Sequence, residues 1–231
     1  METKDLPKLH SDFSVDCVVF GFDKGELRIL LIERAEEPFK DYVALPGNLV
    51  YDNENIDQAP PRVLTELTGL NDVYMEQLYA FGDVDRHPQG RVITIAYFAL
   101  IKVKKHTLSP ISTYARKAQW YSINELPPLA FDHAQILEKA YRRLQSGIRY
   151  QPIGFELLPE KFTLSQLQQL YEVILEKPID KRNFRKKILS FGLLAELDEK
   201  QKNVSHRAAK LYKFNKTRYN NLKKMGFSFE L

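Results

Sequence analysis

The sequence predicts two parts of different fold class: an α/β (α+β) part with a mixed sheet and flanking helices, and a smaller part with two helices and a β-hairpin. Three observations predict this. Strand-like and helical segments alternate through residues 1–150, the order changes to helix, turn, helix and hairpin in residues 151–231, and net charge changes sign between these parts. With 231 residues, 44% of them hydrophobic, the chain is long enough for two cores.

The first part opens with a predicted hairpin. VDCVVFGF (15–22) and LRILLIER (27–34) are rich in β-branched or aliphatic residues, and the turn-prone DKGE separates them. YVALPGNLVY continues as strand and loop, YMEQLYAFGDV and RVITIAYFALIKV follow, and AQWYSINELPPL adds a last strand and turn. Such an order predicts a mixed sheet.

Two helices are predicted in this part. One runs from about Pro60 to Thr68, with proline in its first turn and Gly69 as its C-cap. The other is AQILEKAYRRLQSGI, which ends near Gly147 and is amphipathic. Its apolar side is formed by Ile136, Leu137, Ala140 and Leu144.

The second part reads as a winged helix-turn-helix. Thr163 or Ser165 can cap the helix LSQLQQLYEVIL, and Asp180 can cap a second helix, KRNFRKKILSF. In this second helix we expect Phe184, Ile188 and Leu189 to face the core. LLAEL and DEKQKNVSHRAAKLYKF then predict two strands joined by a polar, basic loop, which is the wing.

Charge and cysteine content narrow the function classes. Residues 1–150 hold 18 Lys and Arg against 21 Asp and Glu, a net charge of −3, whereas residues 151–231 hold 16 against 9, a net charge of +7. The second part is therefore expected to meet a polyanion. The charged N-terminus and the lack of a long apolar run predict a cytoplasmic protein with no membrane partner. A single cysteine, Cys17, excludes a disulfide framework and a cysteine-based zinc site, and we expect it to be buried.

The basic helix has the composition of a DNA reader, because a helix fits the major groove and its cations reach phosphates or guanine edges. The alternative is that it is only a solvated face. Arg182, Asn183 and Lys186 are the predicted base contacts. The full predicted set is Lys181, Arg182, Asn183, Arg185, Lys186 and Lys187 in this helix, with Lys202, Ser205, His206, Arg207 and Lys210 of the wing as backbone contacts.

The segment GNLVYDNENIDQAPPRVLTELTGL resembles a Nudix box, G-x5-E-x7-R-E-U-x-E-E-x-G-U, where U is a bulky apolar residue. Aligned from Asn48, it keeps Glu54, Arg62 and Glu66, along with the apolar and glycine positions at its end. It departs at Asn48, Val63 and Leu67, which replace the opening glycine and two helix glutamates. Because magnesium needs oxygen ligands, we expect no metal and no catalytic residue here, and Glu54 and Glu66 read most simply as paired or solvated carboxylates.

A polar loop, GDVDRHPQGR (82–91), lies between two predicted strands, and the resemblance extends here to ADP-ribose-handling Nudix proteins. Arginine suits anions and carboxylates suit sugar hydroxyls, although a solvated turn is the simpler alternative. The expected effector-binding residues are Glu54, Arg62, Glu66, Asp83, Asp85, Arg86, His87 and Arg91. Asp132 is expected to cap the helix that follows it, and His87 and His133 are more often structural than catalytic.

The whole chain resembles the Nudix-related transcriptional regulators, because the degenerate box is combined with FTLSQLQQLYEVILEKPIDKRNFRKKIL. This resemblance implies a Nudix α/β/α sandwich over 1–150, a winged helix-turn-helix over 151–231, and a homodimer on a double-stranded DNA operator. The implied effector is ADP-ribose or a sugar such as arabinose, without a cofactor. We expect effector binding to shift two winged helices relative to each other. The alternatives are a magnesium-dependent Nudix hydrolase of a nucleoside diphosphate derivative with an accessory basic domain, and a scaffold that binds neither.

Overall fold

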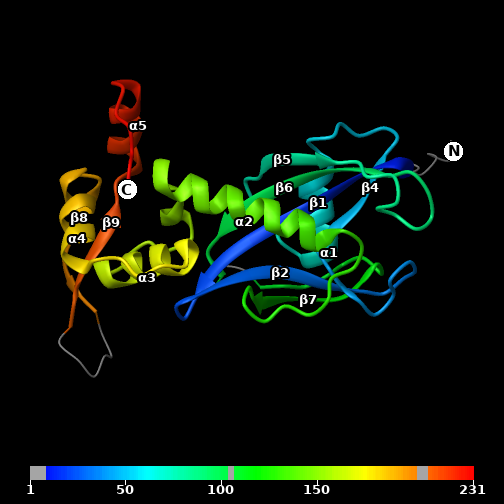
Figure 1. The fold of residues 1–231 in the computed structure, drawn as a ribbon, viewed down its shortest axis with the longest axis horizontal. Coiled ribbons are helices and arrows are strands. Elements are labelled where there is room, and N and C mark those ends of the chain that lie inside the picture. The colour runs from blue at the N-terminus through cyan, green and yellow to red at the C-terminus, as the bar shows by residue number, and fades with distance from the viewer. Residues whose placement is uncertain (1–8, 104–106, 202–207) are drawn as a thin grey trace, which may run out of the picture. The chain divides into compact units, whose positions relative to one another are not determined.

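The computed structural model describes residues 9–103, 107–201 and 208–231, which form two compact units (Figure 1). Unit 1 comprises Met1–Gly21 and Arg28–Tyr141, and unit 2 comprises Phe22–Leu27 and Arg142–Leu231. The turn of the first hairpin therefore belongs to unit 2. The elements in chain order are β1 (Leu9–Asp23), β2 (Glu26–Arg34), β3 (Val43–Ala44), β4 (Gly47–Tyr51), α1 (Ala59–Thr68), β5 (Glu76–Phe81), β6 (Ile93–Ile101), β7 (Ala115–Ser122), α2 (His133–Tyr150), a 3-10 helix (Pro152–Glu156), α3 (Leu164–Leu175), α4 (Lys181–Ser190), β8 (Leu194–Lys200), β9 (Lys210–Phe214) and α5 (Lys216–Lys224).

Unit 1 is built on a mixed sheet, as predicted. Its strand order is β3-β2-β1-β6-β5, with β4 also pairing to β1 and β7 to β2. β1 and β6 are parallel, whereas β1–β4, β2–β3, β2–β7 and β5–β6 are antiparallel. The predicted hairpin of β1 and β2 is confirmed, and its tight turn holds Lys24 and Gly25 at positive φ.

Both faces of β1 are covered, which makes this unit a sandwich. Val15, Cys17 and Val19 alternate along one face and pack in clusters with residues of α1. Val18 and Phe20 point to the other face and are also fully buried. α1 and α2 lie on opposite faces of the sheet (Figure 1). The α/β/α sandwich expected from the resemblance is confirmed, and Cys17 is buried as expected.

The two helices of the first part differ in how well their ends were predicted. α1 has proline in its first turn and ends at Gly69, whose φ of 78° and N–H donation to Thr65 O match the expected C-cap. α2 continues to Tyr150, past the predicted end at Gly147. Gly147 lies inside the helix, and close packing accounts for a glycine there, because a Cβ would lie 2.7 Å from Ile153 Cδ1. Among the described residues, no helix combines the length and the apolar character needed to span a membrane.

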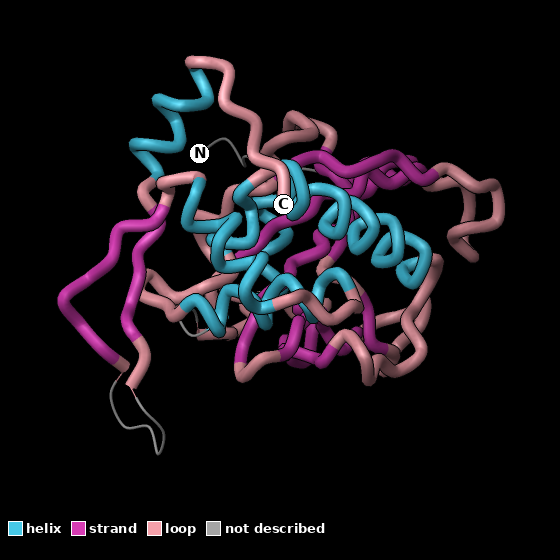
Figure 2. Tube along the Cα trace, turned by 60° about the vertical axis from the view of Figure 1, so that its left-hand side comes forward, coloured by secondary structure: helices cyan, strands magenta, loops and turns pink. Residues whose placement is uncertain are grey.

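Unit 2 has the predicted helix, turn, helix and hairpin order (Figure 1), and Figure 2 shows the two hairpin strands in magenta. Thr163 caps α3 through a reciprocal capping box with Gln166, and the Asp180 side chain accepts from Asn183 N at 2.8 Å at the start of α4. One prediction is wrong: Leu189 is 44% exposed. Phe184 and Ile188, four residues apart, define the core face of α4, and Leu189 lies about 100° further round the helix. α5 was not predicted at all.

Candidate effector cavity and nucleic-acid interface

The segment with the Nudix pattern forms β4, a loop and α1, and the guanidinium of Arg62 lies at its centre. Arg62 donates to Glu54 from Nε at 2.8 Å and from Nη2 at 2.5 Å, and to Glu66 from Nη1 at 3.1 Å. Burial opposes ionisation of Glu54, but hydrogen bonds from Arg62 and from the Tyr51 N–H outweigh it, so the pKa of Glu54 lies below its usual value. Arg62 therefore occupies both carboxylates that the pattern retains.

The two missing helix carboxylates are replaced by core residues. Val63 and Leu67 are 0% and 1% exposed, and they pack in one cluster with Val15 and Ile32. Magnesium takes several oxygen ligands, which valine and leucine lack. In the part of the chain that the structure describes, no three His, Cys or carboxylate side chains are grouped to hold a metal. The residues of this chain do not fit the magnesium site of a Nudix enzyme.

Unit 1 contains a cavity of about 310 Å³ beside this segment, near the small end of the range for ligand pockets. Asn48 and Leu67 line it from the Nudix segment, and Arg34 lines it from the end of β2. Nε of Arg34 donates to Pro38 O at 2.8 Å, and Arg34 forms no ion pair with any described carboxylate. A cationic group is therefore available to an anionic ligand.

Aromatic rings form one side of the cavity. The rings of His87 and Phe131 are stacked with centroids 5.2 Å apart and an angle of 13° between their planes, and the Arg34 guanidinium lies 4.9 Å from the Phe131 ring centre. Burial lowers the pKa of His87, and the nearby charges of Arg86 and Arg34 lower it further. His87 is therefore a neutral, flat ring at neutral pH. The arrangement favours a ligand with a planar ring and an anionic group.

Arg86 is the buried cation of the predicted polar loop. Its Nε and Nη2 donate to the two carboxylate oxygens of Asp132 at 2.9 and 2.7 Å, and Nη2 lies 3.6 Å from Asp16 Oδ2. The Arg86 side chain is only 3% exposed. The Asp132 side chain thus binds Arg86 and does not cap α2 as expected. This network fixes the loop at the cavity wall, because a buried charge without a partner would be costly.

Asp16 connects this network to α2. His133 Nδ1 accepts from Leu45 N at 3.0 Å, so the proton of the neutral ring is on Nε2, which lies 3.3 Å from Asp16 Oδ1. Thr94 Oγ1 donates to Asp16 Oδ2 at 2.7 Å. Burial alone would raise the pKa of Asp16, but His133, Arg86 and Thr94 together lower it below its usual value. Asp16 is therefore ionised at the floor of the cavity.

The structure separates the predicted effector residues into three groups. Arg86 and His87 line the cavity. Asp83, Asp85 and Arg91 are exposed and do not line it. Glu54 lines a separate open hollow with Tyr51, while Arg62 and Glu66 are engaged with it in the ion-pair cluster.

Sequence reasoning missed most of the cavity wall. The missed lining residues that matter most are Asp16, Arg34, Asn48, Phe131 and His133. Three of them had a signal, because Asn48 replaces the opening glycine of the box and Phe131 and His133 flank Asp132 in one short segment. Asp16 and Arg34 lie in strand-like runs where nothing marked them.

α4 presents cations to solvent. Lys181, Arg182, Asn183, Lys186 and Lys187 are exposed, and none of these lysines and arginines forms an ion pair with a described carboxylate. Arg185 differs, because it is half-buried and its Nη2 donates to Ser165 Oγ at 3.0 Å. This surface can meet a polyanion without first breaking an ion pair.

In the described part of the hairpin, unlike in α4, lysine side chains are paired with glutamates. Lys210 is paired with Glu196 across β8 and β9, and this hydrogen bond raises the pKa of Lys210. Lys161 Nζ lies 2.7 Å from Glu199 Oε1. The other predicted wing residues, Lys202, Ser205, His206 and Arg207, lie outside the described residues.

Comparison with known proteins matches both units. Residues 10–144 match the NUDIX domain, and residues 154–214 match the NrtR DNA-binding winged helix domain. The chain is 36% identical over 205 residues to the ADPR responsive transcriptional repressor NtrR of Acinetobacter baylyi, covering 87% of this chain and 81% of the relative. It is 35% identical over 151 residues to an ADP-ribose pyrophosphatase of Methanocaldococcus jannaschii, covering 64% of this chain and 85% of the relative.

One solved relative resembles the chain along most of its length. Shewanella oneidensis NrtR in complex with a 27mer DNA is 32% identical, with a TM-score of 0.76, and the match covers 87% of this chain and 93% of that one. Its NUDIX domain, solved with ADP ribose, is 29% identical with a TM-score of 0.55, over 62% of this chain and 94% of that one. The chain therefore belongs to the NrtR family of transcriptional repressors, in which a Nudix domain precedes a DNA-binding winged helix domain.

Proposed function

We propose that this chain is a repressor that binds operator DNA through unit 2 and changes its DNA affinity when ADP-ribose binds in the cavity of unit 1. One observation carries the proposal: the cavity beside the Nudix helix offers a cation and flat rings, while Arg62 occupies the carboxylates that an enzyme would use for magnesium. Such a cavity is suited to binding a phosphorylated ligand without cleaving it.

The lining of the cavity favours ADP-ribose over a free sugar. ADP-ribose combines an adenine ring, a diphosphate and ribose hydroxyls. Arg34 suits the diphosphate, the stacked rings of His87 and Phe131 suit adenine, and the ionised Asp16 suits a hydroxyl donor. A pentose such as arabinose has neither an anionic group nor a planar ring, so it would use neither the cation nor the rings of the cavity lining.

The chain also provides a covalent route from the cavity to the DNA-binding unit. Ser14 and Asp16 of β1 and Arg34 of β2 line the cavity, while the turn that joins these strands belongs to unit 2. Ligand binding that displaces either strand would be transmitted to that turn. ADP-ribose must bind one arrangement more tightly than the other, because a ligand with equal affinity for both shifts nothing. Two copies acting as a homodimer on a two-fold operator would double this effect.

The test is fluorescence anisotropy of the full chain on duplex DNA from upstream of its own gene and neighbouring genes, with scrambled DNA as reference and at two salt concentrations. We expect one fragment to be preferred at physiological salt, and ADP-ribose to release it, with arabinose inactive. Equal affinity for all fragments, lost at the higher salt concentration, would refute the proposed repressor function. Preferred binding that ADP-ribose leaves unchanged would refute the proposed effector.

The contribution of the cavity to ADP-ribose binding is tested by replacing one arginine that lines it and one arginine that lies outside it. Arg34→Ala should weaken ADP-ribose binding at least tenfold in calorimetry, about 1.4 kcal/mol, because a charge-assisted contact is lost. Arg116→Ala is the control, because Arg116 lies on β7 outside the cavity lining and pairs with Asp41 and Glu33. Equal affinities of the two variants would place the ligand elsewhere.

A hydrolase remains the second candidate, because a pyrophosphatase relative is 35% identical over its matched region. It predicts magnesium-dependent cleavage of ADP-ribose that disappears in Glu66→Gln. We expect no turnover above a protein-free control in either wild type or variant, since Arg62 holds Glu66 and core residues replace its neighbours. Cleavage of ADP-ribose by the wild type that disappears in Glu66→Gln would establish that the chain is a hydrolase.

A further inference from the structure

The last helix, α5, lies outside the matched winged helix domain, which ends at residue 214. Its sequence, KTRYNNLKK, contains four cations and no carboxylate, and none of its residues is buried. Only Tyr219 and Leu222 are partly buried, and a nine-residue helix gains little stability from its own turns. Packing in a core therefore does not explain why α5 is rich in lysine and arginine.

The flanks of α5 hold it against the end of α4. The Asn215 side chain caps α5 by accepting from Arg218 N at 2.9 Å, and Phe214 packs on Tyr219. Beyond the helix, the chain returns so that the buried Phe229 packs on Phe191, directly after α4, with ring centroids 4.9 Å apart. The position of α5 in unit 2 is thus set by residues on both sides of it.

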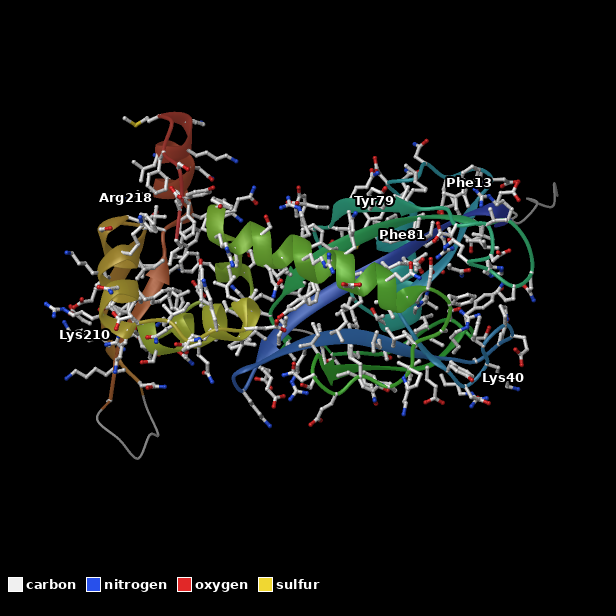
Figure 3. The ribbon with its side chains drawn as sticks, in the orientation of Figure 1. Phe13, Lys40, Tyr79, Phe81, Lys210 and Arg218 are labelled. Carbon is white, nitrogen blue, oxygen red and sulfur yellow. The ribbon has the colours of Figure 1, made fainter. Side chains whose placement is uncertain are left out.

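Cations of unit 2 fall into paired and unpaired sets. Lys210, Lys213 and Lys216 each pair with a glutamate. Arg218, Lys223 and Lys224 form no ion pair with any carboxylate that the structure describes. The Arg218 guanidinium lies beside Gly192, where a Cβ would be 3.0 Å from Nη2, so it adds a cation next to the C-terminal end of α4 (Figure 3).

We propose that α5 is a second DNA-contacting element, which grips the phosphate backbone through Arg218, Lys223 and Lys224. The proposal rests on the proposed function of unit 2 as a DNA reader. In Figure 1, α5 and the far end of the hairpin strands lie at opposite ends of this unit, with α4 between them. A duplex lying along α4 would therefore meet α5 on the side away from the hairpin. Exposed lysines at a helix end suit phosphate and carry no sequence information.

The test is the salt dependence of binding by the full chain to one scrambled duplex and one preferred duplex. Lys223→Ala/Lys224→Ala should make the slope of log affinity against log salt shallower by about 2, since each phosphate contact contributes about 0.9. Affinity should fall by the same factor on both duplexes. The control is Lys40→Ala/Lys102→Ala, which removes two lysines of unit 1 that form no ion pair with a described carboxylate, and it should keep the wild-type slope. Arg218→Ala should lower the slope by about one more unit, and Arg218→Lys should restore it.

Thermal melts check that each variant is folded, and Lys223→Gln/Lys224→Gln, which keeps side-chain length, should reproduce the change in slope. A wild-type slope in both double variants of α5 would overturn the inference even though wild type prefers one duplex. A change on the preferred duplex alone would also overturn it, because phosphate contacts act on every sequence. If wild type itself prefers no fragment, the proposed repressor function fails, and the scrambled duplex still reports on α5.

Discussion

Arginines and lysines serve opposite purposes in the two units. In unit 1, Arg62 and Arg86 are directed inward and each contacts two carboxylates. In α4 of unit 2, Lys181, Arg182 and Lys186 are exposed without an ion pair to any described residue. The first set is held by carboxylates of its own unit, whereas the second set is open to a polyanion. Pairing therefore identifies a surface for a polyanion more sharply than net charge, because Lys210 and Lys213 of the hairpin are also basic yet each is paired with a glutamate.

The largest expected effect is on stability, in Arg86→Ala. Removal of this guanidinium leaves Asp16 and Asp132 as buried carboxylates without their cation. Breaking such a pair should lower the free energy of unfolding by about 3–5 kcal/mol, measured by urea unfolding. The control is Lys40→Ala, because Lys40 is exposed on unit 1 (Figure 3) and pairs with no carboxylate among the described residues, and this change should leave stability unchanged. Equal urea midpoints for the two variants would mean that the buried, paired Arg86 contributes no more to stability than the exposed Lys40.

Asp16→Asn should have a smaller effect that depends on pH. The folded-state pKa of Asp16 is lowered, so its ionised form adds stability above its unfolded pKa of about 4, and this is lost as pH falls through the folded pKa. We expect a loss of about 2–3 kcal/mol at neutral pH, because charge-assisted hydrogen bonds are replaced by neutral ones. The difference from wild type should shrink in acid. A gap that stays constant down to pH about 3 would contradict an ionised Asp16.

Local signals in the sequence predicted most of the fold but little of the cavity. Pro60 and Gly69 marked the ends of α1, and Thr163 and Asp180 marked the starts of α3 and α4, because caps act within a few residues. The Arg86–Asp132 pair joins residues 46 apart in sequence, which no local pattern reveals. α5 was missed because KTRYNNLKK has no apolar stripe, although Asn215 and Gly226 bracket it.

In unit 2, Arg182→Ala should leave stability unchanged and weaken operator binding. Arg182 is exposed on α4 and forms no ion pair with a residue that the structure describes, so its removal leaves no described carboxylate without a cation. If it reads a guanine, the cost is about 1–3 kcal/mol on the preferred duplex, with one base preference relaxed. Anisotropy on single-base variants of that duplex measures both. Equal weakening on every sequence would reassign Arg182 to a phosphate contact.

Lys181→Ala should have the smallest effect, and it acts in opposite directions on folding and binding. Lys181 and Arg182 occupy the first turn of α4, which contains no acidic residue, although the positive end of a helix dipole disfavours cations there. Removing this lysine should therefore stabilise the fold slightly, by about 0.3–0.5 kcal/mol, in thermal melts at low salt. The same change should make the salt slope of DNA binding shallower by about 1, equally on preferred and scrambled duplexes. A destabilised variant with unchanged slope would mean that Lys181 has a structural role. A gain in stability with a loss in binding would mean that α4 keeps an unfavourable charge for the sake of DNA.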